Sequence, residues 1–270
     1  MGPRVLLLAI FCGSLFAQQD SHFFPERIGD LGIKREAAMW PDPETVLRDL
    51  RSDKVEVNTA ALRLVGVNQR TYPRGAPEYA RLQYSTVGGI NPKTVAILTV
   101  GQSAFEYAAI VVPSANAWKR IAVLECWCKY ESYEDFVNPQ HLADYPDQAL
   151  VARASGGGTG MYEQTEAWFR IRNGRVELVL SFTSRLRECA TDFDPCTWEH
   201  RWFDLRGPQL VETEDVEKPP FKDVEPAVTR ELEEARHFKN VTCTPYKWDP
   251  VNFRYIPSGP AGPCHYVPPK

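Results

Sequence analysis

The dipeptide Asn173-Gly174, with alternating residues on both sides of it, is the feature that most constrains the fold of this chain. A two-residue type I′ turn needs positive φ at both positions, and Asn-Gly is the sequence that favours it most. Pairing outward from the turn places three apolar pairs on one face: Ile171–Val176, Phe169–Leu178 and Ala167–Leu180. The other face would hold Trp168 opposite Val179. Residues 165–184 therefore predict an antiparallel β-hairpin with one side in the core, and with Arg172 and Arg175 solvated beside its turn.

The chain around this hairpin also has the patterns of β-structure. Short β-rich runs separated by turn-forming residues predict further strands at 95–100, 105–112, 118–127, 149–154, 198–205 and 209–212. We therefore expect a mainly β (α+β) protein whose main antiparallel domain, residues 82–216, is a β-sandwich or an open barrel-like sheet. Residues 217–270 are interpreted as a linker, a short helix at 227–238 and a last hairpin that packs on the β domain.

Residues 43–67 differ from the rest because their apolar residues recur with helical spacing. They follow an irregular lead-in at 18–42. Pro43 is suited to a first helical turn, and Asp42 can cap it. Two apolar stripes separated by Ser52-Asp53 predict a helical hairpin.

This helical segment resembles a single HEAT repeat, in the run PETVLRDLRSDKVEVNTAALRLVG. The matching positions are Pro43, Leu47, Leu50, Asp53, Val57, Ala61, Leu64 and Gly66. The run departs from the family at Asn58, where arginine is usual, and the sequence holds no second copy. The resemblance implies a pair of antiparallel helices of a kind used as protein-binding scaffolds. One pair cannot bury its apolar faces alone, so we expect it to pack on the β domain, where it either binds a partner or only caps the domain. The remainder resembles exported bacterial β-rich proteins in general, which implies no particular activity.

The first 17 residues have the pattern of a secretory signal peptide. Arg4 supplies the positive charge, residues 5–11 form an apolar core, and a cleavage site follows at Ala17. This core is too short to span a bilayer, and no later segment is long and apolar enough to do so. The sequence therefore predicts a secreted or periplasmic protein.

Removal of this leader would take away one of the seven cysteines and leave six, and an even number in an exported chain predicts disulfides. Two pairs flank short segments and are natural local partners: Cys189 with Cys196, and Cys243 with Cys264. The remaining pair, Cys126 and Cys128, would have Cα atoms roughly 6.6 Å apart on a straight strand, with parallel side chains. Either the strand is irregular there, or one of these cysteines bonds to a neighbouring strand and the local scheme fails elsewhere.

Several chemistries find no support in the sequence. The formal net charge of −4 and the lack of a long basic run give no reason to expect nucleic-acid binding. Residues 156–160 are glycine-rich but lack the lysine of a phosphate-binding loop, and the histidines lack metal-ligand spacing. We therefore predict neither a cofactor nor a metal. Carboxylates for glycoside hydrolysis are available on or near strands, yet nothing singles out a pair among Glu125, Glu163, Glu166 and Glu199.

Four tryptophans are the candidate ligand-binding residues: Trp127, Trp168, Trp198 and Trp202. Aromatic rings on a sheet can line a sugar-binding face, but they can equally pack a core because they bury a large area. The leading hypothesis is an exported, non-enzymatic protein with a binding or structural role, whose partner is a protein or a glycan. The alternative is a glycoside hydrolase or carbohydrate-binding protein that acts on envelope polysaccharide.

Overall fold

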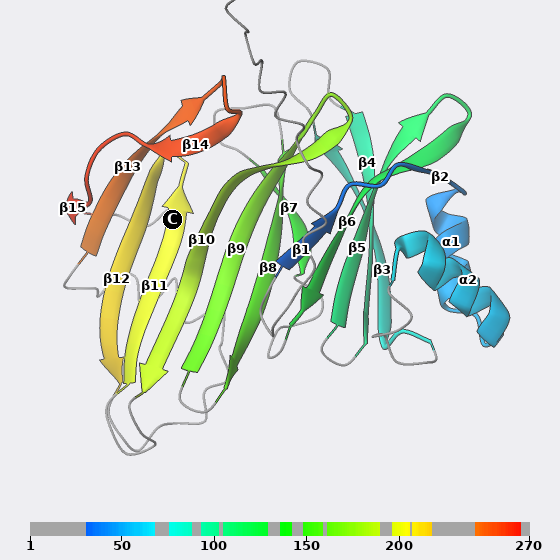
Figure 1. Ribbon diagram of the computed structural model, residues 1–270, viewed down its shortest axis with the longest axis horizontal. Helices are drawn as coiled ribbons and strands as arrows, with labels where there is room; N and C mark the ends of the chain where they lie inside the picture. The colour runs from blue at the N-terminus through cyan, green and yellow to red at the C-terminus, as the bar shows by residue number, and fades with distance from the viewer. Residues whose placement is uncertain are drawn as a thin grey trace, which may run out of the picture.

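The computed structural model describes residues 31–67, 76–87, 93–102, 105–128, 136–141, 148–158, 161–189, 196–205, 207–217 and 241–265. This part of the chain is mainly β, with two antiparallel sheets and two helices (Figure 1). The predicted mainly β, sandwich-like fold class is confirmed. The predicted signal peptide, the short helix predicted at 227–238 and most of the predicted linker lie outside the described residues.

The first sheet, here called sheet A, has the strand order β1-β6-β5-β4-β3, and β2 also pairs with β6. Its strands are β1 (Leu31–Lys34), β2 (Ala38–Trp40), β3 (Tyr79–Val87), β4 (Lys93–Gln102), β5 (Phe105–Ser114) and β6 (Ala117–Trp127). The segment interpreted as an irregular lead-in thus contributes two short strands, which pair with the long strand β6. Strands of three or four residues are too short to show an alternating pattern.

The second sheet, sheet B, has the order β14-β13-β12-β11-β10-β9-β8-β7, and β15 also pairs with β13. Its strands are β7 (Val137–His141), β8 (Gln148–Gly158), β9 (Met161–Arg172), β10 (Arg175–Cys189), β11 (Cys196–Asp204), β12 (Gln209–Glu217), β13 (Val241–Asp249), β14 (Arg254–Pro257) and β15 (Gly262–Pro263). The expected last hairpin is present as β13 and β14. The sequence did not indicate β7, which contains Pro139. This strand lies at the edge of the sheet, where proline is tolerated.

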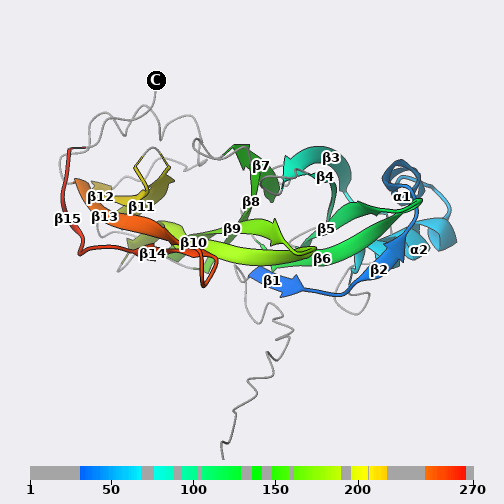
Figure 2. The ribbon, with the colours of Figure 1, turned by 90° about the horizontal axis from the view of Figure 1, so that it is seen from above.

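The two helices are α1 (Pro43–Leu50) and α2 (Val55–Val65), and they form where the apolar stripes predict. The Asp42 side chain accepts a hydrogen bond of 3.2 Å from the backbone N–H of Thr45, which caps α1. Gly66 ends α2 at a φ of 97°, in the left-handed conformation that glycine adopts without strain. In Figure 2 the helices lie at one end of the molecule and β13 to β15 at the other.

Apolar packing explains how these layers hold together. The helices cover one face of sheet A, where Val46, Leu50 and Val65 pack with Leu98 and Val111 of the strands. The other face of sheet A packs on sheet B in a second cluster of buried side chains, which includes Ile97, Ile110, Leu124, Leu150, Phe169 and Val176. A third cluster on sheet B joins Trp168, Val179 and Leu180 to Phe203 and Tyr255, near the C-terminal hairpin. The central strands of sheet A are therefore buried on both faces.

The central hairpin forms, with the predicted register next to its turn. Asn173 and Gly174 have φ values of 52° and 72°, and the pairs from Arg172–Arg175 to Phe169–Leu178 are confirmed. A β-bulge follows between Leu178 and Leu180, so that Leu180 faces Trp168.

Two predicted pairs are therefore wrong, because the bulge shifts the register by one residue. Ala167 faces Ser181 instead of Leu180, and Val179 is not the partner of Trp168. Leu178, expected in the core, is 46% exposed, whereas Val179 and Leu180 are both buried. Alternation could not reveal the extra residue, because Leu178, Val179 and Leu180 are all apolar.

The described residues include three disulfides, which join all six of the predicted cysteines. Cys189 bonds to Cys196 and Cys243 to Cys264, so both local pairs are confirmed. Cys126 bonds to Cys128, with 5.2 Å between their Cα atoms. That separation is shorter than a straight strand allows, and β6 ends at Trp127 between the two cysteines. The open alternative is thus resolved in favour of irregular backbone at this point.

Candidate binding surface on sheet B

The four candidate tryptophans lie in three different places. Trp127 is the last residue of β6 in sheet A, and its ring stacks on Phe105 with centroids 6.0 Å apart. Trp168 is buried in the third apolar cluster, where its Nε1 donates a 2.6 Å hydrogen bond to Glu166. Trp198 and Trp202 both belong to β11 and are half-buried. Only β11 therefore brings two of the four together.

Side chains from three strands surround Trp198. Arg187 on β10 lies directly opposite Trp198 on β11 and directly opposite Tyr162 on β9, so all three point to the same side of the sheet. The Arg187 guanidinium carbon lies 5.6 Å from the indole centroid, and the Tyr162 ring centroid lies 6.2 Å from it. The His200 ring stacks on the indole at 5.6 Å. We call Tyr162, Arg187, Trp198 and His200 the Trp198 cluster; all four are half-buried.

The neighbouring row of the sheet is also polar, although only Arg185 and His200 in it are half-buried, and Gln164 and Thr213 are buried. Arg185 lies opposite both Gln164 and His200, and His200 lies opposite Thr213. Ser184 donates a 2.9 Å hydrogen bond to the Gln164 side chain. Hydrogen-bonding groups of several kinds thus border the indole along two successive rows of strands β9 to β12.

A disulfide closes the same pair of strands. Cys189 and Cys196 are directly opposite each other, two positions along from the Arg187–Trp198 pair. A covalent link at that distance fixes the register of β10 against β11. The geometry of the Trp198 cluster is therefore held before any ligand arrives.

The sequence identified only part of this surface. Alternation places Trp198, His200 and Trp202 on one side of a strand, but it says nothing of the partners across the ladder. Arg187 and Tyr162 were missed because their positions depend on the register beyond a second irregularity, between Thr183 and Arg185. The register between β9 and β10 is thus the information that places Arg187 and Tyr162 beside Trp198.

The four carboxylates considered for glycoside hydrolysis are dispersed over the two sheets. Glu125 is buried in sheet A, with its Oε2 2.7 Å from the Lys34 ammonium. Glu163 accepts a 3.3 Å hydrogen bond from Thr183, whereas Glu166 pairs with Arg153 at 3.0 Å. Glu199 pairs with Arg201 at 2.6 Å, and Arg201 also holds Glu212.

These contacts give each of the four carboxylates a different partner. Glu163 and Glu166, which are three residues apart on β9, have side chains on opposite sides of that strand. In the described part of the chain, these hydrogen bonds and ion pairs do not join any two of the four.

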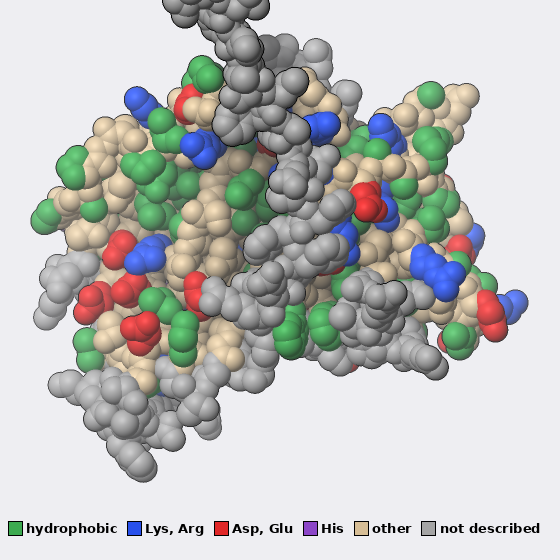
Figure 3. Space-filling model, in the orientation of Figure 1, with side chains coloured by type: hydrophobic (Ala, Val, Ile, Leu, Met, Phe, Trp, Pro, Cys, Tyr) green, Lys and Arg blue, Asp and Glu red, His purple; other side chains and the backbone are tan. Residues whose placement is uncertain are grey.

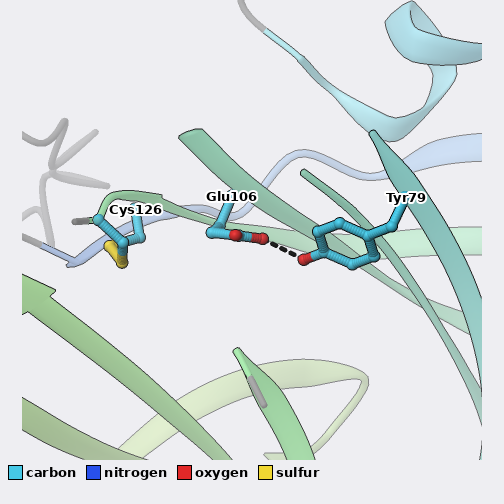
Figure 4. Close-up of a disulfide and its surroundings, with 4 residues drawn as sticks. Tyr79, Glu106 and Cys126 are labelled. Carbon is cyan, nitrogen blue, oxygen red and sulfur yellow. Dashed lines mark hydrogen bonds between the residues drawn. A yellow bond between two sulfur atoms is a disulfide. The ribbon is translucent and has the colours of Figure 1, made fainter. Parts of the chain in front are cut away.

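A further carboxylate, Glu106, is buried between the sheets and is fully engaged there (Figure 4). The Tyr79 hydroxyl donates a hydrogen bond to its Oε2 across β4, and Cys126 is its neighbour on β6. Gly101 lies between them in register, and a Cβ atom there would collide with the Tyr79 ring. The missing side chain at position 101 lets the ring reach Glu106, so this pair ties the edge strand β3 to the interior of sheet A.

Over the described ranges, no group of three or more His, Cys, Asp or Glu residues is arranged to hold a metal ion. Neither α1 nor α2, the helices of the described ranges, has the length and apolar character needed to cross a membrane.

Comparison with known proteins gives no relative: no family model, no curated protein and no solved structure matches this chain.

Proposed function

We propose that this chain is an exported, non-enzymatic binding protein that recognises a glycan at the Trp198 cluster. The observation that carries the proposal is a half-buried indole on a sheet surface, surrounded by the hydrogen-bonding side chains of Tyr162, Arg187 and His200. Sugars present C–H groups that pack on aromatic rings and hydroxyls that need donors and acceptors. The Trp198 cluster offers both within one small area.

The rigidity of the surface supports this role. A weakly held side chain loses conformational entropy when it binds, which lowers affinity. In this cluster the guanidinium of Arg187 and the imidazole of His200 already rest against the indole, and the Cys189–Cys196 disulfide holds the two strands. Ligand binding would therefore cost little further conformational entropy of these side chains.

Export is supported by two separate observations. Disulfides form and persist in oxidising compartments, and the described residues contain three of them. Residues 1–17 have the pattern of a secretory leader. Envelope and extracellular glycans are the sugars that such a protein would meet.

The test is a glycan-array screen of the mature protein, with the affinity of each positive glycan measured by calorimetry. We expect Trp198→Ala to weaken binding about tenfold or more, as truncation of a tryptophan at a binding hot spot does. Trp127→Ala is the matched control, because it removes the same side chain from the other sheet and should leave affinity unchanged. A protein that binds no glycan, or a Trp198→Ala variant with undiminished affinity, would refute the proposal. Release of reducing sugar would favour hydrolysis.

A further inference from the structure

A second cluster of cationic and aromatic side chains lies at the other end of β10 from the Trp198 cluster. Arg172 and Arg175 face each other across the Asn173-Gly174 turn, and both are exposed. The type I′ conformation leaves this turn little freedom, so the backbone from which the two side chains extend is fixed. Like charges directly opposite each other on a sheet repel. An anion bound between them would attract both guanidinium groups and so offset this repulsion.

The C-terminal hairpin supplies an aromatic surface beside these arginines. The guanidinium carbon of Arg172 lies 4.8 Å from the ring centroid of Phe253, and that of Arg170 lies 5.5 Å from it. Arg170 also lies 5.1 Å from the Trp248 centroid. The guanidinium is planar, so a ring beneath it orients that plane and directs the N–H groups outward along its edges, where they fit the oxygens of an anion. The rings thus orient two arginines side by side.

Phe253 is held in an unusual backbone conformation at this place. Its φ is 51°, in the left-handed region that a bulky residue rarely adopts. The residue is kept there by the Trp248 ring, 5.0 Å away, and by the turn before it, in which Asp249 accepts hydrogen bonds from the backbone N–H groups of Val251 and Asn252. Strained residues that the surroundings hold in place cluster at ligand clamps.

The local charge is opposite in sign to that of the whole chain, whose formal net charge is −4. Arg35 reaches the same turn and donates a 3.0 Å hydrogen bond to the carbonyl of Val176. The central hairpin carries Arg170, Arg172 and Arg175 here, with Glu177 opposite Arg170, and the C-terminal hairpin carries Arg254 opposite Asp249. Figure 3 shows basic side chains among hydrophobic ones over the β13–β14 hairpin. This surplus of arginines would attract anions.

We propose that Arg170, Arg172, Arg175 and Phe253 form an anion site that binds the carboxylate or sulfate groups of an acidic polysaccharide. The arginine forks match such groups with paired hydrogen bonds. A glycan is favoured over a lipid surface because Val251, the exposed apolar side chain at the tip of the C-terminal hairpin, gives too little area for insertion into a bilayer. This site does not depend on the Trp198 cluster and stands whether or not that cluster binds sugar.

The experiment is calorimetric titration of the mature protein with a heparin hexasaccharide and with an oligogalacturonate, which separate sulfate from carboxylate. We expect binding of at least one, weakened by added salt, and a loss of about tenfold or more in Arg172→Ala/Arg175→Ala. Arg172→Lys/Arg175→Lys keeps the charge but loses the fork, so its affinity should fall in between. The control, Arg48→Ala/Arg63→Ala, removes the same charge from the helical hairpin and should bind as the wild type does.

The outcomes separate this site from its alternatives. Failure of the wild type to bind either oligosaccharide would overturn the proposal, as would equal losses in the control, which would indicate net charge alone. Binding to vesicles of anionic lipid without binding to either oligosaccharide would also overturn it and identify a membrane surface. Circular dichroism confirms the fold of each variant, and the lysine variant supplies the answer if the alanine variant fails to fold. Trp198→Ala should retain acidic oligosaccharide binding, so loss of glycan binding at Trp198 alone leaves this site intact.

Discussion

Strand β4 of sheet A and strand β11 of sheet B are buried to very different degrees. In sheet A the helices cover one face and sheet B covers the other, so that β4 is buried from Val95 to Gly101. In sheet B the strand β11 is only half-buried from Thr197 to Trp202. The same antiparallel pairing is therefore found in strands covered on both faces in sheet A and in strands that stay partly exposed to solvent in sheet B.

The difference shows how each sheet is stabilised. Sheet A gains its stability from apolar burial, which is roughly proportional to the area removed from water. Sheet B has less cover, and it carries the two disulfides that link one strand or segment to another, Cys189–Cys196 and Cys243–Cys264. Arginines resting on Trp198, Trp248 and Phe253 add further contacts at its two ends. Both proposed binding sites lie on this sheet, where Arg172 and Arg175 are exposed, the Trp198 cluster is half-buried and Arg170 is buried beside them.

The largest effect we expect comes from a truncation in sheet A. Ile97 is fully buried between the sheets, and Ile97→Ala should lower the free energy of unfolding by about 2–5 kcal/mol, through lost burial and the cavity left behind. Leu178, in contrast, is 46% exposed on sheet B. Leu178→Ala should change the free energy of unfolding by less than about 1 kcal/mol. Urea unfolding of the mature protein measures both. Equal losses would mean that the two sheets do not differ in this way.

Removal of disulfides should affect sheet B next. Serine substitution of Cys243 and Cys264, which are 21 residues apart, should cost about 3 kcal/mol in the loop-entropy model. The same change at Cys189 and Cys196, seven residues apart, should cost about 2 kcal/mol. Thermal unfolding gives the order of stability, and calorimetry gives glycan affinity. Only removal of the Cys189–Cys196 disulfide, which lies beside the Trp198 cluster, should weaken glycan binding. An equal loss of affinity on removal of Cys243–Cys264 would contradict the role of Cys189–Cys196 in holding the site.

Local patterns predicted a large part of the fold. Asn173-Gly174 located the central turn, the apolar stripes after Pro43 located both helices, and the spacing of Cys189 and Cys196 indicated their disulfide. Each of these features depends on residues close together in the chain. The burial of sheet A beneath the helices and sheet B depends on contacts between distant segments, which periodicity does not encode.

The candidate site was harder to predict, because it depends on register across several strands. Trp198 was identified as a candidate, but Arg187 and Tyr162 become its neighbours only through the pairing of three strands. Two bulges in β10 shift that pairing, and each is hidden in a run of residues that still looks regular. The arginine–phenylalanine contact of Arg172 is harder still, since it joins residues 81 positions apart.

The smallest effect we expect is a local pH dependence at the tip of the C-terminal hairpin. Hydrogen bonds donated by Asn252 and by the backbone N–H of Val251, together with the charge of Arg254, hold the pKa of Asp249 below its usual range. A carboxylate whose pKa is lowered in the folded state stabilises that state above its unfolded pKa, and this contribution disappears as the pH falls through the folded pKa. The amides of Val251 and Asn252 should therefore lose hydrogen-exchange protection in acid, while those of Ile97 and its neighbours in sheet A keep theirs. Asp249→Asn should abolish the response at the tip, and an unchanged acid response in this variant would show that another group is responsible.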